Sequence, residues 1–305
     1  MTKRADLSAR FVDLQLPMSK IFLLSAIFLS CLALREVQAQ CSDAGLCTIG
    51  GIHDLDRYTD GRVSIVYQFG KSPKEDSMTY HTIRISEQFE FIPGSVGKFI
   101  LPLNLQDGPL GTVKGIGDLL LAYEQRVFNF NDRRMLLEVG VKIATASQNV
   151  DSLPQKYQSG LGTNDLLFNA EYRAKWYFLS VGYQQPFGRS TNYEQLKRGP
   201  DLALRLGYYN TFGKFNLTSE LIAVKRFGTA SIAYVPQPGE TDPPEFVDVP
   251  NSDPFQLNAS VESIYVANKA FQVSAGVAFP FLKREFNIDG LARSVTAKVG
   301  FHYTH

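Results

Sequence analysis

The sequence predicts an all-β fold, an antiparallel up-and-down barrel of about twelve strands that crosses a membrane. Three observations carry this prediction. From Gly61 onward, apolar and polar side chains alternate along one segment after another. The connections between these segments alternate between long polar loops and tight turns. Apart from the N-terminus, no stretch of the 305 residues is uniformly apolar over the length of a membrane-spanning helix, and the mean hydropathy of the chain is -0.11.

A repeated unit defines one type of strand. Residues 115–126, GIGDLLLAYEQR, and residues 162–173, GTNDLLFNAEYR, place Gly, Asp, Glu and Arg at the same spacing, and a weaker copy, GPDLALRLGYY, begins at Gly199. In the first two copies the three charged residues share one parity, which puts them on one face of a strand. The opposite face is apolar and carries Leu119, Leu121, Tyr123, Val127, Leu166, Phe168, Ala170, Tyr172 and Ala174. Such strands fit between lipid on one side and a wet lumen on the other.

Other segments show the same alternation. They are expected at residues 62–69, 80–91, 98–105, 135–144, 177–187, 214–227, 255–267, 271–279 and 294–305. Only Glu87 interrupts the apolar face of the second of these segments. Loops are expected between the segments, among them 106–115, 147–162 and the acidic, proline-rich stretch 236–254.

The lengths of the connections predict the topology. Long loops follow the odd-numbered segments and short turns follow the even-numbered ones. This asymmetry is typical of barrels in the outer membrane of Gram-negative bacteria, which have extracellular loops and periplasmic turns, and an even strand number puts both termini in the periplasm. A short turn at Asn131 and Asp132 is expected to bring Arg126 nearly opposite Glu138, as a cross-strand ion pair.

Aromatic residues flank the short turns, where an interfacial girdle is expected. They are Phe128, Phe130, Tyr172, Trp176, Tyr208, Phe212, Tyr265 and Phe271. The last segment, SVTAKVGFHYTH, has aromatic residues at alternate positions near its end. It resembles the C-terminal assembly signal of outer-membrane barrels, except that it finishes on His305. The resemblance implies outer-membrane lipid and the barrel-assembly machinery as partners.

The first 39 residues are expected to comprise an N-terminal extension and a cleaved export signal. A 14-residue apolar run at 21–34 follows Lys20, and Val37, Gln38 and Ala39 fit a cleavage site before Gln40. Met18 is a candidate for the true start, because the residues before it do not resemble a signal. The alternative is an anchor helix, although the run is shorter than the roughly 20 residues that span a bilayer.

Residues 40–60 form a separate N-terminal segment without strand alternation. Cys41 and Cys47 lie six positions apart in it, and export to an oxidising compartment predicts a small-loop disulfide between them. The segment either plugs the barrel lumen or hangs in the periplasm. We expect no metal site, because this cysteine pair with His53 supplies too few ligands for zinc, and we expect no cofactor.

The exported chain is expected to be almost neutral. Of 31 basic and 30 acidic residues, residues 1–39 contain five basic and three acidic ones, which leaves 26 and 27. Neither a basic nor an acidic excess remains, so the composition does not predict a nucleic-acid partner.

The charged face of the predicted strands supplies the candidate lumen-lining residues. They are Asp118, Glu124, Arg126, Glu138, Lys142, Asp165, Glu171, Arg173, Asp201 and Arg205. Six acids against four bases predict weak ion selectivity. Most of these residues are expected to pair across the wall and stiffen it, whereas Asp118, Asp165 and Asp201 begin successive strands at the loop end and are expected to line a vestibule.

Short motifs in the return strands resemble one family. After the G-x-G-D-L repeat come Val139-Gly140, Val181-Gly182 with Pro186-Phe187-Gly188, and Ala275-Gly276 with Pro280. Residues 97–305 resemble the outer-membrane proteins associated with the meta-cleavage pathway of phenol degradation, which are similar to outer-membrane transporters of fatty acids and aromatic hydrocarbons. The resemblance implies passive passage of small hydrophobic or aromatic solutes. Residues 214–227 lack the Val-Gly motif.

Three alternatives compete with a transport barrel. A secreted soluble β protein also has alternating strands. A lipolytic outer-membrane enzyme would need a histidine beside a serine on the lipid side, and His81 shares the parity of the outward Ile83, but no serine motif accompanies it. We therefore expect no enzyme. An adhesion or structural barrel would act through the acidic loop at 236–254.

Overall fold

The structure of the protein is a computed structural model that describes residues 61–72, 74, 76–233, 245–253, 255–282 and 288–305. The predicted signal at 1–39, the candidate start Met18, the segment 40–60 and the Cys41 and Cys47 pair lie outside the described residues. None of the described helices is long and apolar enough to cross a membrane.

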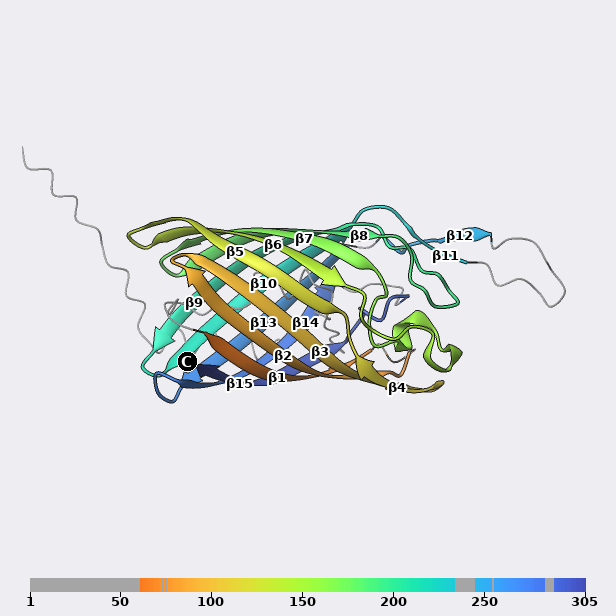
Figure 1. Cartoon of the computed structure of the whole chain (residues 1–305), viewed down its shortest axis with the longest axis horizontal. Coiled ribbons are helices and arrows are strands. Elements are labelled where there is room, and N and C mark those ends of the chain that lie inside the picture. The colour runs from red at the N-terminus through yellow and green to blue at the C-terminus, as the bar shows by residue number, and fades with distance from the viewer. Residues whose placement is uncertain (1–60, 73, 75, 234–244, 254, 283–287) are drawn as a thin grey trace, which may run out of the picture. The chain divides into compact units, whose positions relative to one another are not determined.

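The described chain forms one closed antiparallel barrel (Figure 1). Its strands are β1 (Arg62–Lys71), β2 (Thr79–Ile92), β3 (Ser95–Gly108), β4 (Gly111–Ile116), β5 (Leu119–Phe130), β6 (Arg133–Ile143), β7 (Asn164–Ala174), β8 (Tyr177–Phe187), β9 (Asp201–Phe212), β10 (Phe215–Arg226), β13 (Phe255–Val266), β14 (Phe271–Leu282) and β15 (Val295–Thr304). The sheet order is β2-β1-β15-β14-β13-β10-β9-β8-β7-β6-β5-β3-β4, and the additional pairing of β2 with β3 closes the ring.

Strands β4 and β5 together make one wall strand, so the barrel has twelve strands. The inner half of β3, Ser95 to Ile100, pairs with β5, and its outer half, Leu103 to Gly108, pairs with β4. The predicted fold class and strand number are confirmed. The expectation of a loop at 106–115 was wrong: β3 and β4 continue as a hairpin, whose turn contains only Pro109 and Leu110.

One extra residue sits between β4 and β5. Ile100 pairs with Leu120 and Leu103 pairs with Ile116, so two residues of β3 face three on the other strand. Gly117 lies in this bulge, and its N–H donates to the carbonyl of Pro102 at 2.8 Å. A bulge reverses the parity of the strand. Because of this reversal, Ile116 before the bulge and Leu121 after it both point outward, although one is at an even and the other at an odd position, while Asp118 is buried.

The two ends of the barrel differ as predicted. Short turns at 93–94, 131–132, 175–176, 213–214 and 267–270 lie at one end, here called the turn end. Figure 1 shows the C-terminus at this end and the β3–β4 hairpin at the opposite end, the loop end. The longer connections 144–163, 188–200, 227–254 and 283–294 leave the barrel at the loop end. Ring contacts join neighbouring strands near the turn end, in the pairs Tyr177–Tyr208, Phe215–Tyr265 and Phe271–Tyr303. A fourth contact, Phe128–Tyr172, reaches from β5 across β6 to β7.

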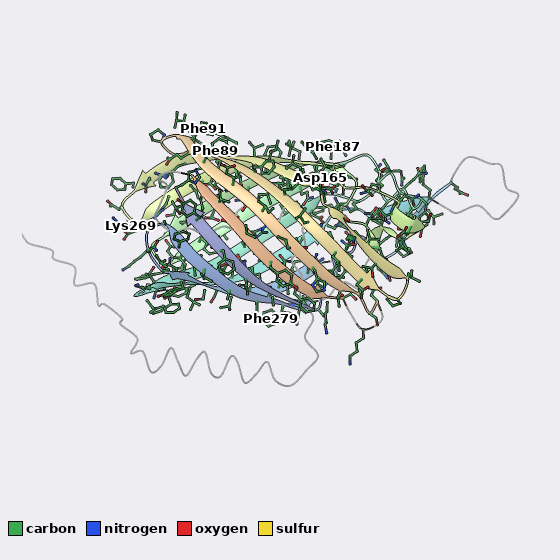
Figure 2. All side chains as sticks on the ribbon, turned by 60° about the horizontal axis from the view of Figure 1, so that its bottom comes forward. Phe89, Phe91, Asp165, Phe187, Lys269 and Phe279 are labelled. Atoms are coloured by element: carbon green, nitrogen blue, oxygen red, sulfur yellow. The ribbon has the colours of Figure 1, made fainter. Side chains whose placement is uncertain are left out.

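The outer face of the barrel is apolar. Its exposed side chains come from nearly every wall strand and include Ile65, Ile83, Leu103, Leu121, Val139, Phe168, Val181, Leu204, Leu221, Val277 and Phe301. Figure 2 shows Phe91 and Phe279 on the outside of the barrel. A soluble β protein would bury such a surface, because a patch of this size is costly in water. The soluble alternative is therefore wrong, and the surface is one that lipid covers.

Candidate functional site

The inner face of the barrel carries the predicted charged residues. Nine of the ten candidates are buried, and Arg126 is half-buried. Asp118, Lys142 and Asp165 lie toward the loop end, as do Asp201 and Arg205. The others, Glu124, Arg126, Glu138, Glu171 and Arg173, lie nearer the turn end. Their partners explain how charged side chains remain inside the barrel.

Lys98 holds two acids together near the turn end. Its Nζ lies 2.7 Å from Glu124 Oε2 and 2.9 Å from Glu138 Oε1, and all three side chains are buried. Glu124 is directly opposite Glu138, whereas Arg126 is opposite Leu136. The expected register of Arg126 was therefore wrong. A bulge between Arg126 and Phe128 shifts the pairing, so the cation that bridges the two glutamates comes from the next strand.

Glu171 and Arg173 pair along one strand. They lie two positions apart on β7, and Arg173 Nε donates to Glu171 Oε1. Both side chains are buried, as is Arg205 on β9. A carboxylate kept out of water needs such a partner, because unpaired burial of a charge is very costly.

Asp118 anchors the loop between β6 and β7. Its Oδ2 accepts a hydrogen bond of 2.7 Å from the N–H of Leu161, and its Oδ1 accepts one of 3.3 Å from the N–H of Ala146. This loop, residues 144–163, is called the inserted loop here. It contains two short 3-10 helices, η3 (Val150–Ser152) and η4 (Gln155–Tyr157). One buried carboxylate thus fastens both ends of the inserted loop.

Asp165 anchors the loop between β8 and β9. Its Oδ2 lies 2.8 Å from Lys142 Nζ, on the neighbouring strand, and 2.9 Å from Arg198 Nη2, in the loop 188–200. Thr163 donates to the other oxygen at 2.7 Å. Arg198 is completely buried at its side chain. The loop therefore contributes a cation to the wall.

Asp201 anchors the last loop through a second residue. Arg226 lies opposite Asp201 in the sheet and donates two hydrogen bonds of 2.9 Å to its carboxylate. The remaining guanidinium nitrogen, Nη1, donates to Asp289 Oδ2 at 2.9 Å. Residues 288–294 are called the terminal loop. Each of the three repeated aspartates is thus buried and tied to a different loop.

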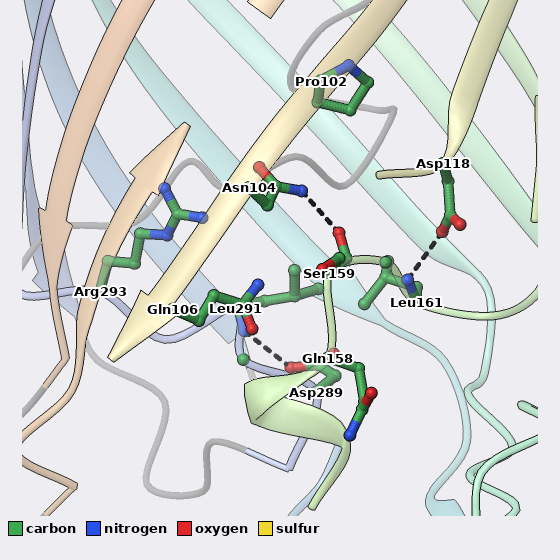
Figure 3. A pocket seen from close by; sticks show the side chains of 12 residues that line it. Pro102, Asn104, Gln106, Asp118, Gln158, Ser159, Leu161, Asp289, Leu291 and Arg293 are labelled. Carbon is green, nitrogen blue, oxygen red and sulfur yellow. Dashed lines mark hydrogen bonds between the residues drawn. The ribbon is translucent and has the colours of Figure 1, made fainter. Parts of the chain in front are cut away.

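These contacts enclose a narrow polar cavity at the loop end (Figure 3). Its volume is about 40 Å³, enough for a few water molecules. The inner face of β3, the inserted loop and the terminal loop surround it, together with Asp118 from the bulge between β4 and β5. The lining side chains include Asn104, Gln106, Asp118, Gln158, Leu161, Asp289, Leu291 and Arg293. Asn104 also donates to the carbonyl of Ser159 at 2.5 Å, which joins β3 to the inserted loop.

An apolar cluster packs beside this cavity. Tyr157 of the inserted loop is buried against Met78, Tyr80 and Val113. The guanidinium of Arg293 lies 4.7 Å from the centre of the Tyr80 ring, close enough for a cation–π interaction. The mouth of the barrel therefore combines a small polar cavity with aromatic side chains.

The loop 188–200 is also bonded to the inserted loop. Glu194 Oε2 accepts a hydrogen bond of 2.6 Å from the N–H of Gln155. Burial raises the pKa of the Glu194 carboxyl, and this hydrogen bond and Lys156 oppose the shift. Burial therefore favours the protonated form of this carboxyl.

Beyond these loops lies a small hairpin. It consists of β11 (Ala230–Ala233) and β12 (Phe246–Val249). Arg189 stacks on Phe246, with its guanidinium 3.6 Å from the ring centre. Most of the acidic stretch 236–254 lies outside the described residues, so an adhesive role for it stays a prediction.

The histidines bear on the enzyme alternative. His81 Nδ1 is hydrogen-bonded to Tyr67 at 2.7 Å, and its ring packs on Phe69. No described serine bonds to it. His302 does contact serines, Ser64 and Ser274, each at 2.9 Å from one ring nitrogen. In a catalytic triad, one ring nitrogen of the histidine contacts a serine and the other contacts an acid. Both ring nitrogens of His302 contact serines, so this group differs from a triad.

Sequence reasoning missed the loop residues of this site. Arg198, Asp289 and Arg293 lie in connections without periodicity, so no local pattern marked them. Two other residues of the site could have been predicted from strand alternation. Lys98 and Arg226 share the inward parity of their strands, as their burial shows.

Comparisons with known proteins give the same fold. No family model and no curated protein matches the chain. The structure is similar to the COG4313 outer membrane channel from Pseudomonas putida F1, with a TM-score of 0.61 and 10% identity over 84% of this chain and 98% of that one. It is also similar to the KdgM porin (TM-score 0.43, 10% identity, 80% and 99% covered) and the NanC porin (0.45, 8%, 80% and 100%).

These structural neighbours are channels and porins of the outer membrane. The likeness to the COG4313 outer membrane channel shows that the fold is that of an outer-membrane barrel, and the predicted fold is confirmed.

Proposed function

We propose that the protein is an outer-membrane channel through which small solutes diffuse passively. The observation that carries this proposal is the polar cavity at the loop end, which β3, the inserted loop and the terminal loop surround. We interpret this cavity as the narrowest part of the passage and call it the constriction. Loops that enter a barrel and leave a narrow wet gap select solutes by size and polarity. The long loops are extracellular in this proposal, and the turn end is periplasmic.

The wall below the constriction supports weak ion selectivity. Its charges are arranged in pairs and triads of opposite sign, such as Lys98 with Glu124 and Glu138. Such groups largely cancel each other's field, unlike a ring of one sign. Small ions of both signs therefore cross with similar ease.

The solute class follows from the family resemblance. That resemblance implies small hydrophobic or aromatic molecules, and we propose the same class here.

Planar-bilayer recordings test both parts of the proposal. Purified protein is expected to give discrete conductance steps, with similar permeability for cations and anions. An added aromatic alcohol is expected to interrupt the current, and a sugar alcohol of similar size is the matched control. Absence of any conductance refutes the channel. Conductance that both solutes reduce equally refutes the aromatic class alone.

A further inference from the structure

A groove lies on the outer surface of the barrel near the loop end. It crosses β1, β2, β3 and β4 and has a volume of about 570 Å³. Its lining residues are Tyr67, His81, Ile83, Leu103, Asn104, Leu105, Lys114, Gly115 and Ile116. Most of these belong to the outward face, opposite the face that carries the constriction. The groove is therefore continuous with the lipid-covered surface.

The sheet register arranges the outward residues of these strands in three rows. The first row is Tyr67, Ile83, Leu103 and Ile116; the second is Phe69, His81, Leu105 and Lys114; the third, closest to the loops, is Lys71, Thr79, Asp107 and Thr112. The rows change from mainly apolar, through mixed, to polar. This gradient marks the boundary between acyl chains and headgroups.

Lys114 has an unusual place in the second row. It is exposed on the outward face, directly opposite Leu105. No described carboxylate pairs with it, and the nearby acid Asp107 accepts a hydrogen bond from Thr112. A phosphate headgroup stabilises an ammonium at the edge of the lipid. Each lysine near a membrane surface raises the affinity for anionic lipid roughly fivefold.

His81 adds a second polar group at the same level. Tyr67 occupies its Nδ1 at 2.7 Å, which holds the ring in place. Its other nitrogen, Nε2, has no partner among the described residues. Lys71, one row higher, keeps its Nζ 5.9 Å from the centre of the Phe69 ring. Lys71, Lys114 and His81 thus lie at the level of the headgroups, next to the apolar first row.

We propose that this groove binds one membrane lipid with a net negative phosphate headgroup. The acyl chain lies on Ile83, Leu103 and Ile116, and the phosphate lies at Lys114. Continuity with the lipid-facing surface and the charge of the upper rows both favour this occupant. The proposal is independent of transport through the lumen.

Lipid retention after purification tests the proposal. The barrel is delipidated in detergent, incubated with equal amounts of phosphatidylglycerol and phosphatidylcholine of identical chains, and separated from excess lipid; native mass spectrometry then counts bound lipids. The wild type is expected to retain phosphatidylglycerol preferentially. Lys114→Gln is expected to lower this retention about fivefold and Lys114→Arg to preserve it.

The matched control is Lys175→Gln at the turn end. Lys175 is also exposed, and its Nζ lies 5.1 Å from the Trp176 ring. This control is expected to retain lipid like the wild type. A wild type without preference for phosphatidylglycerol, equal retention by Lys114→Gln, or displacement of the lipid by inorganic phosphate alone would each overturn the proposal. Heat-dependent gel mobility verifies that every variant is folded.

Discussion

The carboxylate of Asp118 accepts a hydrogen bond of 2.7 Å from the backbone N–H of Leu161, 43 residues further along the chain. The bond ties the inserted loop to the barrel wall at the edge of the cavity. Asp118 is buried, and its other oxygen accepts from Ala146. Asp118 is therefore one of the side chains that hold the inserted loop against the barrel wall.

Replacing Asp118 by alanine is expected to enlarge the passage. Each hydrogen bond to a carboxylate contributes about 1.5–3 kcal/mol, so the loss of one shifts the loop equilibrium toward open forms by roughly tenfold or more. Single-channel recordings of Asp118→Ala should show a higher mean conductance and more frequent transitions than the wild type.

Asp107→Asn is the control for this experiment. Asp107 lies on the outward parity of β3, and its partner Thr112 is local. The control should conduct like the wild type. An unchanged conductance in Asp118→Ala would show that the inserted loop does not limit the passage.

Replacing Lys98 by methionine is expected to destabilise the barrel by about 3–5 kcal/mol. The change leaves Glu124 and Glu138 facing each other, buried and without the ammonium between them. Urea unfolding of protein refolded in lipid vesicles measures the loss. Adding Glu124→Gln and Glu138→Gln should restore much of it, since neutral amides do not repel. A single variant as stable as the wild type would contradict a structural role for this triad.

Replacing Gly207 by alanine is expected to destabilise the barrel by about 1–3 kcal/mol. The ring of Phe178 covers Gly207 on the neighbouring strand, so that a Cβ at this position would overlap the ring. Adding Phe178→Leu should recover part of the loss, because the smaller side chain vacates the space. Urea unfolding of the two single variants and the double variant gives the coupling energy, and additive effects would refute the contact.

The packing of the loops around Glu194 is expected to weaken as the pH rises. The pKa of the Glu194 carboxyl is raised in the packed loops above its ordinary value of 4.5. The packed form therefore binds a proton more tightly than the opened form does, and this stabilisation is lost between the ordinary pKa and the raised one. Limited proteolysis of the loops should accelerate across that window. Glu194→Gln should show no such acceleration, and an unchanged rate in the wild type would contradict the prediction.

The predicted strands were accurate because their signal is local. Residues two apart share a face, and lipid or lumen dictates the polarity of each face. This rule placed Glu138 and Lys142 on the inward face of β6 and Asp165 on the inward face of β7, and all three are buried. The rule failed around the β3–β4 hairpin, where both strands extend beyond the expected membrane span.

Local bulges limit what a periodic pattern predicts. The bulge between Arg126 and Phe128 moves the pairing by one position, so Glu138 lies opposite Glu124. The geometry of a bulge depends on both strands and on their neighbours. The cation that bridges the two glutamates is Lys98, which comes from β3, the strand on the other side of β5. The pattern of β5 and β6 alone could not identify it.

The sequence by itself determined the strand number, the two faces and the two unlike ends, because each is repeated in a local pattern that a solvent enforces. Only the tertiary structure decided how the loops close the mouth. Arg226 meets Asp289 across 63 residues, and Asp165 meets Arg198 across 33. Such contacts form because closure of the barrel brings loops that are distant in the sequence to the same end. The alternation of polar and apolar residues along the chain does not predict them.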